Sequence, residues 1–183
     1  CTKGFEEKTG KLMSEILEQD FEVPNKNIFV LSGPNLSKEI SNKELTGTVI
    51  AGVDIDFINK LSNAMSNAYF IPFINSDRYG VEMGGAMKNI YAIISGYFHE
   101  KGVGENPIGL LLTKSLEEIS IYSHARGANP STFIGLSGVG DFFSTALSAF
   151  SRNYQFGKFL AKDKSPNEAL EMVDDTVEKK SPT

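Results

Sequence analysis

The chain has 183 residues, 40% of them hydrophobic and 22% charged, and a net charge of −5. These values are typical of a globular protein with room for a substantial core, and the negative charge argues against a general nucleic-acid-binding surface. The sequence has no apolar run long enough for a membrane span, and its single cysteine and two histidines indicate neither an internal disulfide nor a metal cluster. We therefore expect a cytoplasmic protein. The chain begins at Cys1 and ends without a closing element, so we expect a piece of a longer protein.

Strands alternate with helices in the first part of the chain. The pattern predicts strands over 28–31, 48–53 and 68–74, and helices over 36–43 and 54–65. Such alternation is typical of a sheet layered with helices, so we expect a mostly parallel sheet. The abrupt start suggests the second half of a sheet whose first half is missing.

Only helices are predicted beyond residue 78. The change of pattern near residues 75–79 predicts an α/β region over 1–77 followed by an all-α region over 78–183. Proline or a capping residue begins the later helices, near Asn106 and Asn129 and at Ser151 and Ser165, and Gly127 ends one of them.

The helix that follows Arg78 contains two adjacent glycines, Gly84 and Gly85, one turn before Lys88 and Asn89. Each interior glycine costs about 0.8–1 kcal/mol relative to alanine, so the pair costs about 2 kcal/mol unless another interaction offsets it. One interpretation is a hollow that admits a small ligand or a cofactor-bearing loop. The other is close helix packing against the glycines, with a surface lysine.

Lys88 is a candidate general acid/base. A lysine transfers protons efficiently near neutrality only when burial or neighbouring cations favour its neutral form, and Lys3 or Arg152 could supply that charge. Asp141, after a glycine-rich bend, could orient the Lys88 ammonium. A helix N-cap is an equally good interpretation of Asp141.

Ser151-Arg152-Asn153 is the best anion-binding candidate. The start of a helix offers free amide donors, and the planar arginine guanidinium matches a phosphate group. A plain serine N-cap beside a solvated arginine explains the same residues, and local sequence favours this simpler alternative.

Several segments together resemble the NAD(P)-dependent glycerol-3-phosphate dehydrogenase family. They occur in the family's order and span nearly the whole chain. The segments are Thr2-Lys3-Gly4-Phe5-Glu6, Leu31-Ser32-Gly33-Pro34 with Lys38-Glu39, Gly80 to Asn89, Gly127 to Pro130, Gly135 to Asp141 with Thr145, and Ser151-Arg152-Asn153 with Phe156-Gly157.

The resemblance implies a partial Rossmann-type, dinucleotide-binding region over 1–77 and a truncated helical substrate-binding domain over 78–183. It implies an oxidoreductase, active as a homodimer, that interconverts sn-glycerol 3-phosphate and dihydroxyacetone phosphate with NAD or NADP. Lys88 matches the family's acid/base lysine. The family's other substrate contacts match Lys3, Gly33, Asn35, Asn89, Asp141, Thr145, Ser151, Arg152 and Asn153. Its cofactor contacts match Ser37, Arg152, Thr176 and Glu178.

The chain departs from the family pattern at Asn35-Leu36-Ser37, at Glu105-Asn106-Pro107-Ile108 and at Lys179. It contains no glycine fingerprint for a pyrophosphate, so we expect that loop to lie outside the chain. Two other functions remain open: a non-catalytic helical module for dimerisation or interaction, and a related dehydrogenase of another hydroxy acid.

Overall fold

The computed structural model describes residues 3–178, with the side chains of residues 3–174. The chain forms two compact units. Among the described residues, the first contains 3–87 together with Leu116–Phe142, and the second contains Lys88–Ser115 together with 143–178. Each unit is described by itself below.

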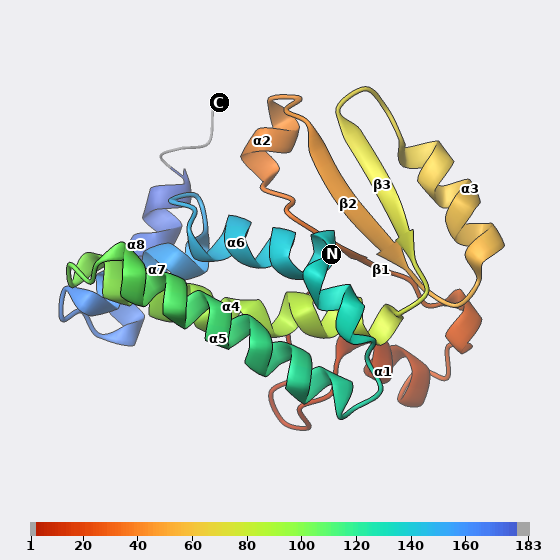
Figure 1. The fold of residues 1–183 in the computed structure, drawn as a ribbon, viewed down its shortest axis with the longest axis horizontal. Helices are drawn as coiled ribbons and strands as arrows, with labels where there is room; N and C mark the ends of the chain where they lie inside the picture. The colour runs from red at the N-terminus through yellow and green to blue at the C-terminus, as the bar shows by residue number, and fades with distance from the viewer. Residues whose placement is uncertain (1–2, 179–183) are drawn as a thin grey trace. The chain divides into compact units, whose positions relative to one another are not determined.

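The first unit contains a three-stranded sheet in the order β1-β2-β3 (Figure 1). The strands are β1 (Val30–Ser32), β2 (Thr46–Ala51) and β3 (Phe70–Asn75). The central strand β2 is buried from Thr48 to Ala51, as its apolar, β-branched sequence predicts. This sheet and the helices after it confirm the expected fold class, a partial Rossmann-type sheet followed by a helical region.

One strand pairing differs from the expected mostly parallel sheet. The β2–β3 pair is parallel, but β1 runs antiparallel to β2. The β1–β2 connection contains only α2 (Ser37–Ser41), a five-residue helix about 7.5 Å long, too short to return the chain to the starting edge. The β2–β3 connection contains α3 (Ile55–Met65), whose 11 residues make a parallel crossover possible.

The helix α3 packs on β3 and β2 and begins where the sequence predicts (Figure 1). The Asp54 carboxylate accepts a hydrogen bond of 2.9 Å from the Phe57 N–H and so caps the helix. Its Ile58 side chain is fully buried, whereas Phe57 is 47% exposed and stacks on Phe29.

The remaining elements of the first unit pack around the start of a long helix. They are α1 (Met13–Gln19), η1 (Asn25–Asn27), η2 (Pro130–Ile134) and η3 (Leu136–Gly140). Asp77 accepts hydrogen bonds from the N–H groups of Gly80 and Asn129 and from the Thr132 hydroxyl, so it fixes that helix start to η2.

Beyond Arg78, the residues that the structure describes form helices and no strand, as predicted. The helices are α4 (Arg78–Glu100), α5 (Glu105–His124), α6 (Asp141–Ala146), α7 (Arg152–Ala161) and α8 (Pro166–Glu178). The predicted capping box of α8 is present, because Ser165 and Glu168 exchange side-chain to backbone hydrogen bonds.

Candidate functional site

A buried carboxylate in the first unit holds the ammonium group of Lys3. Lys3 Nζ lies 2.8 Å from Asp141 Oδ2, and the Ser32 hydroxyl donates to the same oxygen at 3.1 Å. Asp141 and Ser32 are each 1% exposed, so solvent is excluded from the carboxylate and the hydroxyl, whereas the Lys3 side chain is 27% exposed. Charge-assisted hydrogen bonds of this kind are about twice as strong as neutral ones. Asp141 therefore orients the Lys3 ammonium, whereas the sequence analysis proposed this role for it toward the Lys88 ammonium.

The glycine pair of α4 allows this group to pack closely. A Cβ atom on Gly85 would lie 2.9 Å from Ser32 Oγ and 3.4 Å from Lys3 Cδ, and one on Gly84 would lie 3.3 Å from the Ser137 carbonyl oxygen. The packing interpretation is confirmed for both glycines, and the space beside Gly85 is taken by Lys3 and Ser32. The surface lysine of that interpretation is wrong, because Lys88 is only 6% exposed.

In the second unit, Lys88 is held by a threonine of α6. Lys88 Nζ donates to Thr145 Oγ1 at 2.8 Å, and Thr145 is 8% exposed. The structure thus brings together two residues that the sequence resemblance assigned to one substrate. Burial is also the condition that we set for proton transfer by this lysine.

The start of α7 contains the predicted anion-binding residues. The Ser151 hydroxyl accepts a hydrogen bond from the Tyr154 N–H, which confirms the serine N-cap. Arg152 has a side chain that is 60% exposed and forms an ion pair with Asp174 of α8, so it is not merely solvated. Asn153 donates its side-chain amide to Asn89 of α4 at 2.8 Å.

Two glycines let α4 and α7 approach closely enough for that amide contact. A Cβ atom on Gly96 would lie 2.0 Å from the Tyr154 carbonyl oxygen, and one on Gly157 would lie 1.9 Å from the Ile93 carbonyl oxygen. Each helix therefore presents a glycine to the backbone of the other.

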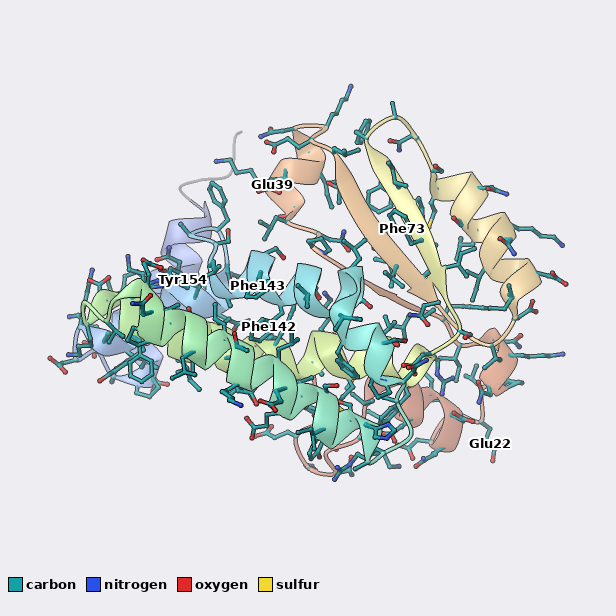
Figure 2. All side chains as sticks on the ribbon, viewed as in Figure 1. Glu22, Glu39, Phe73, Phe142, Phe143 and Tyr154 are labelled. Atoms are coloured by element: carbon teal, nitrogen blue, oxygen red, sulfur yellow. The ribbon has the colours of Figure 1, made fainter. Side chains whose placement is uncertain are left out.

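Tyr154, labelled in Figure 2, joins the same two helices through its side chain. Its hydroxyl oxygen lies 3.0 Å from Nδ1 of His99, and burial raises the pKa of Tyr154.

The far end of this crossing is held by an ionic cluster. Glu100 accepts from Lys158 at 3.1 Å and from Lys162 at 3.2 Å, and these hydrogen bonds lower the pKa of its carboxyl group.

Of the remaining predicted residues, Asn35 is fixed to the sheet. Its amide nitrogen donates to the Gly47 carbonyl at 3.1 Å, and its oxygen accepts from the Thr48 hydroxyl at 2.9 Å. Gly33 has a φ of +151°, and a Cβ atom added to it would lie 3.1 Å from the Thr48 Cα atom. A residue with a side chain would therefore be strained at position 33. Ser37 is exposed at the start of α2. The side chains of Thr176 and Glu178, and all of Lys179, lie outside the described residues.

Sequence reasoning missed Ser32, Asp77 and Asp174 as partners of the site and its scaffold. Ser32 stood inside a quoted segment, directly before Gly33, and its place at the end of a strand was the available signal. Asp174 pairs with a residue 22 positions earlier, and no local pattern indicates that pair.

The first unit also contains a cavity of about 250 Å³ beside β3 and η2. Asn75, Asn129, Thr132, Leu136, Ser137 and Phe73, the last labelled in Figure 2, contribute to its wall. None of the predicted site residues lines it. Within the part of the chain that the structure describes, no three His, Cys, Asp or Glu residues are grouped so that they could hold a metal ion. No helix of that part is long and apolar enough to cross a membrane.

Comparison with known proteins gives matches to both parts of the chain. A family model described as NAD-dependent glycerol-3-phosphate dehydrogenase C-terminus matches residues 77–181, and its N-terminal counterpart matches residues 1–58. A protein from Alcanivorax borkumensis, named glycerol-3-phosphate dehydrogenase (NAD(P)+), is 48% identical over 178 residues, which is 97% of this chain and 51% of that protein. One of the same name from Ectopseudomonas mendocina is 46% identical, over 97% of this chain and 52% of that protein.

Solved structures agree with this relationship. The glycerol-3-phosphate dehydrogenase of Coxiella burnetii matches with a TM-score of 0.88 and 30% identity, over 94% of this chain and 52% of that chain. The yeast enzyme, at 23% identity and a TM-score of 0.80, supports the fold alone. The chain therefore spans about half the length of the relatives that it matches.

These matches first define a class, the nicotinamide-dependent dehydrogenases that combine a Rossmann-type sheet with a helical domain. Within that class, the C-terminal family model alone covers more than half of the chain. The chain belongs to the NAD-dependent glycerol-3-phosphate dehydrogenase family.

Proposed function

We propose that the complete natural protein interconverts sn-glycerol 3-phosphate and dihydroxyacetone phosphate with NAD or NADP. One observation carries the proposal beyond family membership. Lys88, which matches the family's acid/base lysine, is buried and held at 2.8 Å by Thr145, another residue matched to the substrate site. A packing helix alone does not require a lysine and a threonine to be buried together.

In this proposal Lys88 donates a proton to the carbonyl oxygen of dihydroxyacetone phosphate as negative charge develops there. It takes the proton back in the reverse direction. The hydrogen bond to Thr145 helps to hold the Lys88 ammonium in place before the substrate arrives. A bound reduced nicotinamide would supply the hydride.

The phosphate group is assigned to the start of α7. Its first N–H groups carry partial positive charge, and Arg152 exchanges the exposed Asp174 carboxylate for the phosphate. Asn153 is already positioned by Asn89. Binding this remote group helps orient the carbonyl for reduction. The proposed substrate contacts are Lys3, Gly33, Asn35, Lys88, Asn89, Asp141, Thr145, Ser151, Arg152 and Asn153.

The cofactor fits the residues present only in part. Ser37 offers an exposed hydroxyl on the first residue of α2, and Arg152 an exposed cation, both suited to polar cofactor groups. Thr176 and Glu178 complete the proposed cofactor contacts by resemblance. Residues 1–77 are proposed as part of the dinucleotide-binding domain and residues 78–183 as the substrate-binding domain. We further propose a cytoplasmic homodimer.

An initial-rate assay of the complete natural protein tests the proposal. With dihydroxyacetone phosphate we expect oxidation of NADH or NADPH, and with 2-keto acids we expect none. Turnover of a 2-keto acid alone would instead support the related-dehydrogenase alternative. A folded dimer inactive on both substrates would support the non-catalytic alternative.

A further inference from the structure

The first unit contains a serine whose hydroxyl acts on a proposed substrate residue. The Ser32 hydroxyl donates to Asp141 Oδ2 at 3.1 Å, and Lys3 Nζ reaches the same oxygen at 2.8 Å. The two donors thus meet one carboxylate oxygen from different segments of the chain.

The backbone around Ser32 is fixed on both sides. Ser32 is the last residue of β1 and pairs with Val49 of β2, and its carbonyl oxygen lies 3.2 Å from Thr48 Oγ1. Gly33 follows with φ +151° and packs directly over Thr48. The sheet therefore aims the Ser32 hydroxyl, which is the requirement for a donor that orients another group.

The space around this hydroxyl is also restricted by α4. A Cβ atom on Gly85 would lie only 2.9 Å from Ser32 Oγ, closer than such contacts occur, so glycine at position 85 leaves room for the hydroxyl. Ser32 is 1% exposed and Asp141 is 1% exposed. Because solvent is excluded from both, water cannot readily replace the hydroxyl if it is removed.

We propose that Ser32 is a positioning residue that acts through Asp141. The Ser32 hydroxyl holds the Asp141 carboxylate, and that carboxylate in turn holds the Lys3 side chain in the orientation that the substrate requires. This inference rests on the proposed function, since it assigns Asp141 and Lys3 to the substrate.

The first test compares Ser32→Ala with Ser123→Ala in the complete natural protein. Ser123 is a matched control, because it is fully buried in the same unit and its hydroxyl has no hydrogen-bond partner among the described residues. Loss of a hydrogen bond to an ionised group typically changes an equilibrium constant about 10-fold or more. We therefore expect Ser32→Ala to lower kcat/KM for dihydroxyacetone phosphate about 10-fold, with the cofactor KM unchanged. We expect Ser123→Ala to change neither value by more than about 2-fold.

A double-mutant cycle separates positioning from a general structural effect. If Ser32 acts through Asp141, Ser32→Ala should lower kcat/KM by less than about 2-fold when Asp141→Ala, which leaves no acceptor for the Ser32 hydroxyl, is already present. The same 10-fold loss in both backgrounds would overturn the proposal. Should Ser32→Ala fail to fold, Ser32→Cys, which has nearly the same shape but is a weaker donor, replaces it in the cycle.

Urea unfolding of the same four proteins gives a readout that does not depend on activity. Non-additive midpoints are expected if Ser32 and Asp141 are in contact, and additive midpoints would contradict the proposal. If the unaltered protein turns over dihydroxyacetone phosphate but either cycle is additive, Ser32 has no positioning role and the proposed function stands. If the unaltered protein has no turnover, the proposed function fails and the positioning role fails with it.

Discussion

The crossing of α4 and α7 makes the sharpest stability prediction. An alanine at position 96 would place its Cβ atom 2.0 Å from the Tyr154 carbonyl oxygen, and real contacts of this kind are at least 3.0 Å. The helices would have to separate by about 1 Å, a change that typically costs about 1–3 kcal/mol or more in a packed region. The better helix propensity of alanine returns about 0.8–1 kcal/mol of this. Because the clash is with backbone atoms of Tyr154, the cost lies at the upper end of that range, and we expect Gly96→Ala to be destabilised by about 2 kcal/mol.

Gly109 provides the matched control. It also lies inside a helix of the second unit, but a Cβ atom there would meet nothing within 4 Å. Gly109→Ala should therefore gain about 0.8–1 kcal/mol from helix propensity alone. In a thermal denaturation series of the complete natural protein, each kcal/mol corresponds to about 2–4 °C. We expect Tm to fall by about 4–8 °C for Gly96→Ala and to rise by about 2–4 °C for Gly109→Ala.

The same substitution should affect substrate binding. Separation of the helices would break the 2.8 Å contact between Asn153 and Asn89 and move the start of α7. KM for dihydroxyacetone phosphate should rise in Gly96→Ala and stay unchanged in Gly109→Ala. A Gly96→Ala protein as stable as Gly109→Ala, with an unaltered KM, would refute the reasoning for this crossing.

Three further predictions concern single polar groups. Arg152→Lys should raise KM for dihydroxyacetone phosphate far more than for unphosphorylated dihydroxyacetone, because a point charge does not reproduce the bidentate guanidinium; equal effects would place the phosphate elsewhere. Asn35→Ala removes the side-chain amide that is hydrogen-bonded to Gly47 and Thr48 of β2. The unfolding free energy should therefore fall by about 1–2 kcal/mol, and an unchanged urea midpoint would contradict this. The pKa of Glu100 is lowered in the folded protein, so its contribution to stability is present above the carboxyl group's ordinary pKa of 4.5 and is lost as pH falls through the folded-state pKa. The stability difference between Glu100→Gln and the unaltered protein should therefore shrink on acidification, and a constant difference would contradict the assignment.

Local features of this fold were readable from the sequence. Apolar spacing gave the helices, and the caps at Asp54, Ser151 and Ser165 are formed by residues three positions from their partners. The antiparallel β1–β2 pair was not predicted, because alternation of element types does not reveal that α2 is too short for a parallel crossover.

The candidate site depends on contacts between distant residues. Lys3 and Asp141 are 138 positions apart, and Lys88 and Thr145 are 57 positions apart. Periodicity and capping rules act over a few residues, so they could not pair these groups. The family resemblance assigned them to one substrate, and the structure adds which donor meets which acceptor. The hydroxyl of Ser32 became visible only when its strand end was placed against Asp141.

The most direct test of the central claim is the turnover of Lys88→Ala in the complete natural protein, measured with dihydroxyacetone phosphate and the preferred reduced nicotinamide. Alanine favours helix, so the protein should fold, as circular dichroism and Tm would verify. If Lys88 is the proton donor, kcat and kcat/KM should each fall by about 10²-fold or more, and Lys88→Arg should not restore them, because a guanidinium stays protonated. A folded Lys88→Ala enzyme with near-normal turnover would contradict the account.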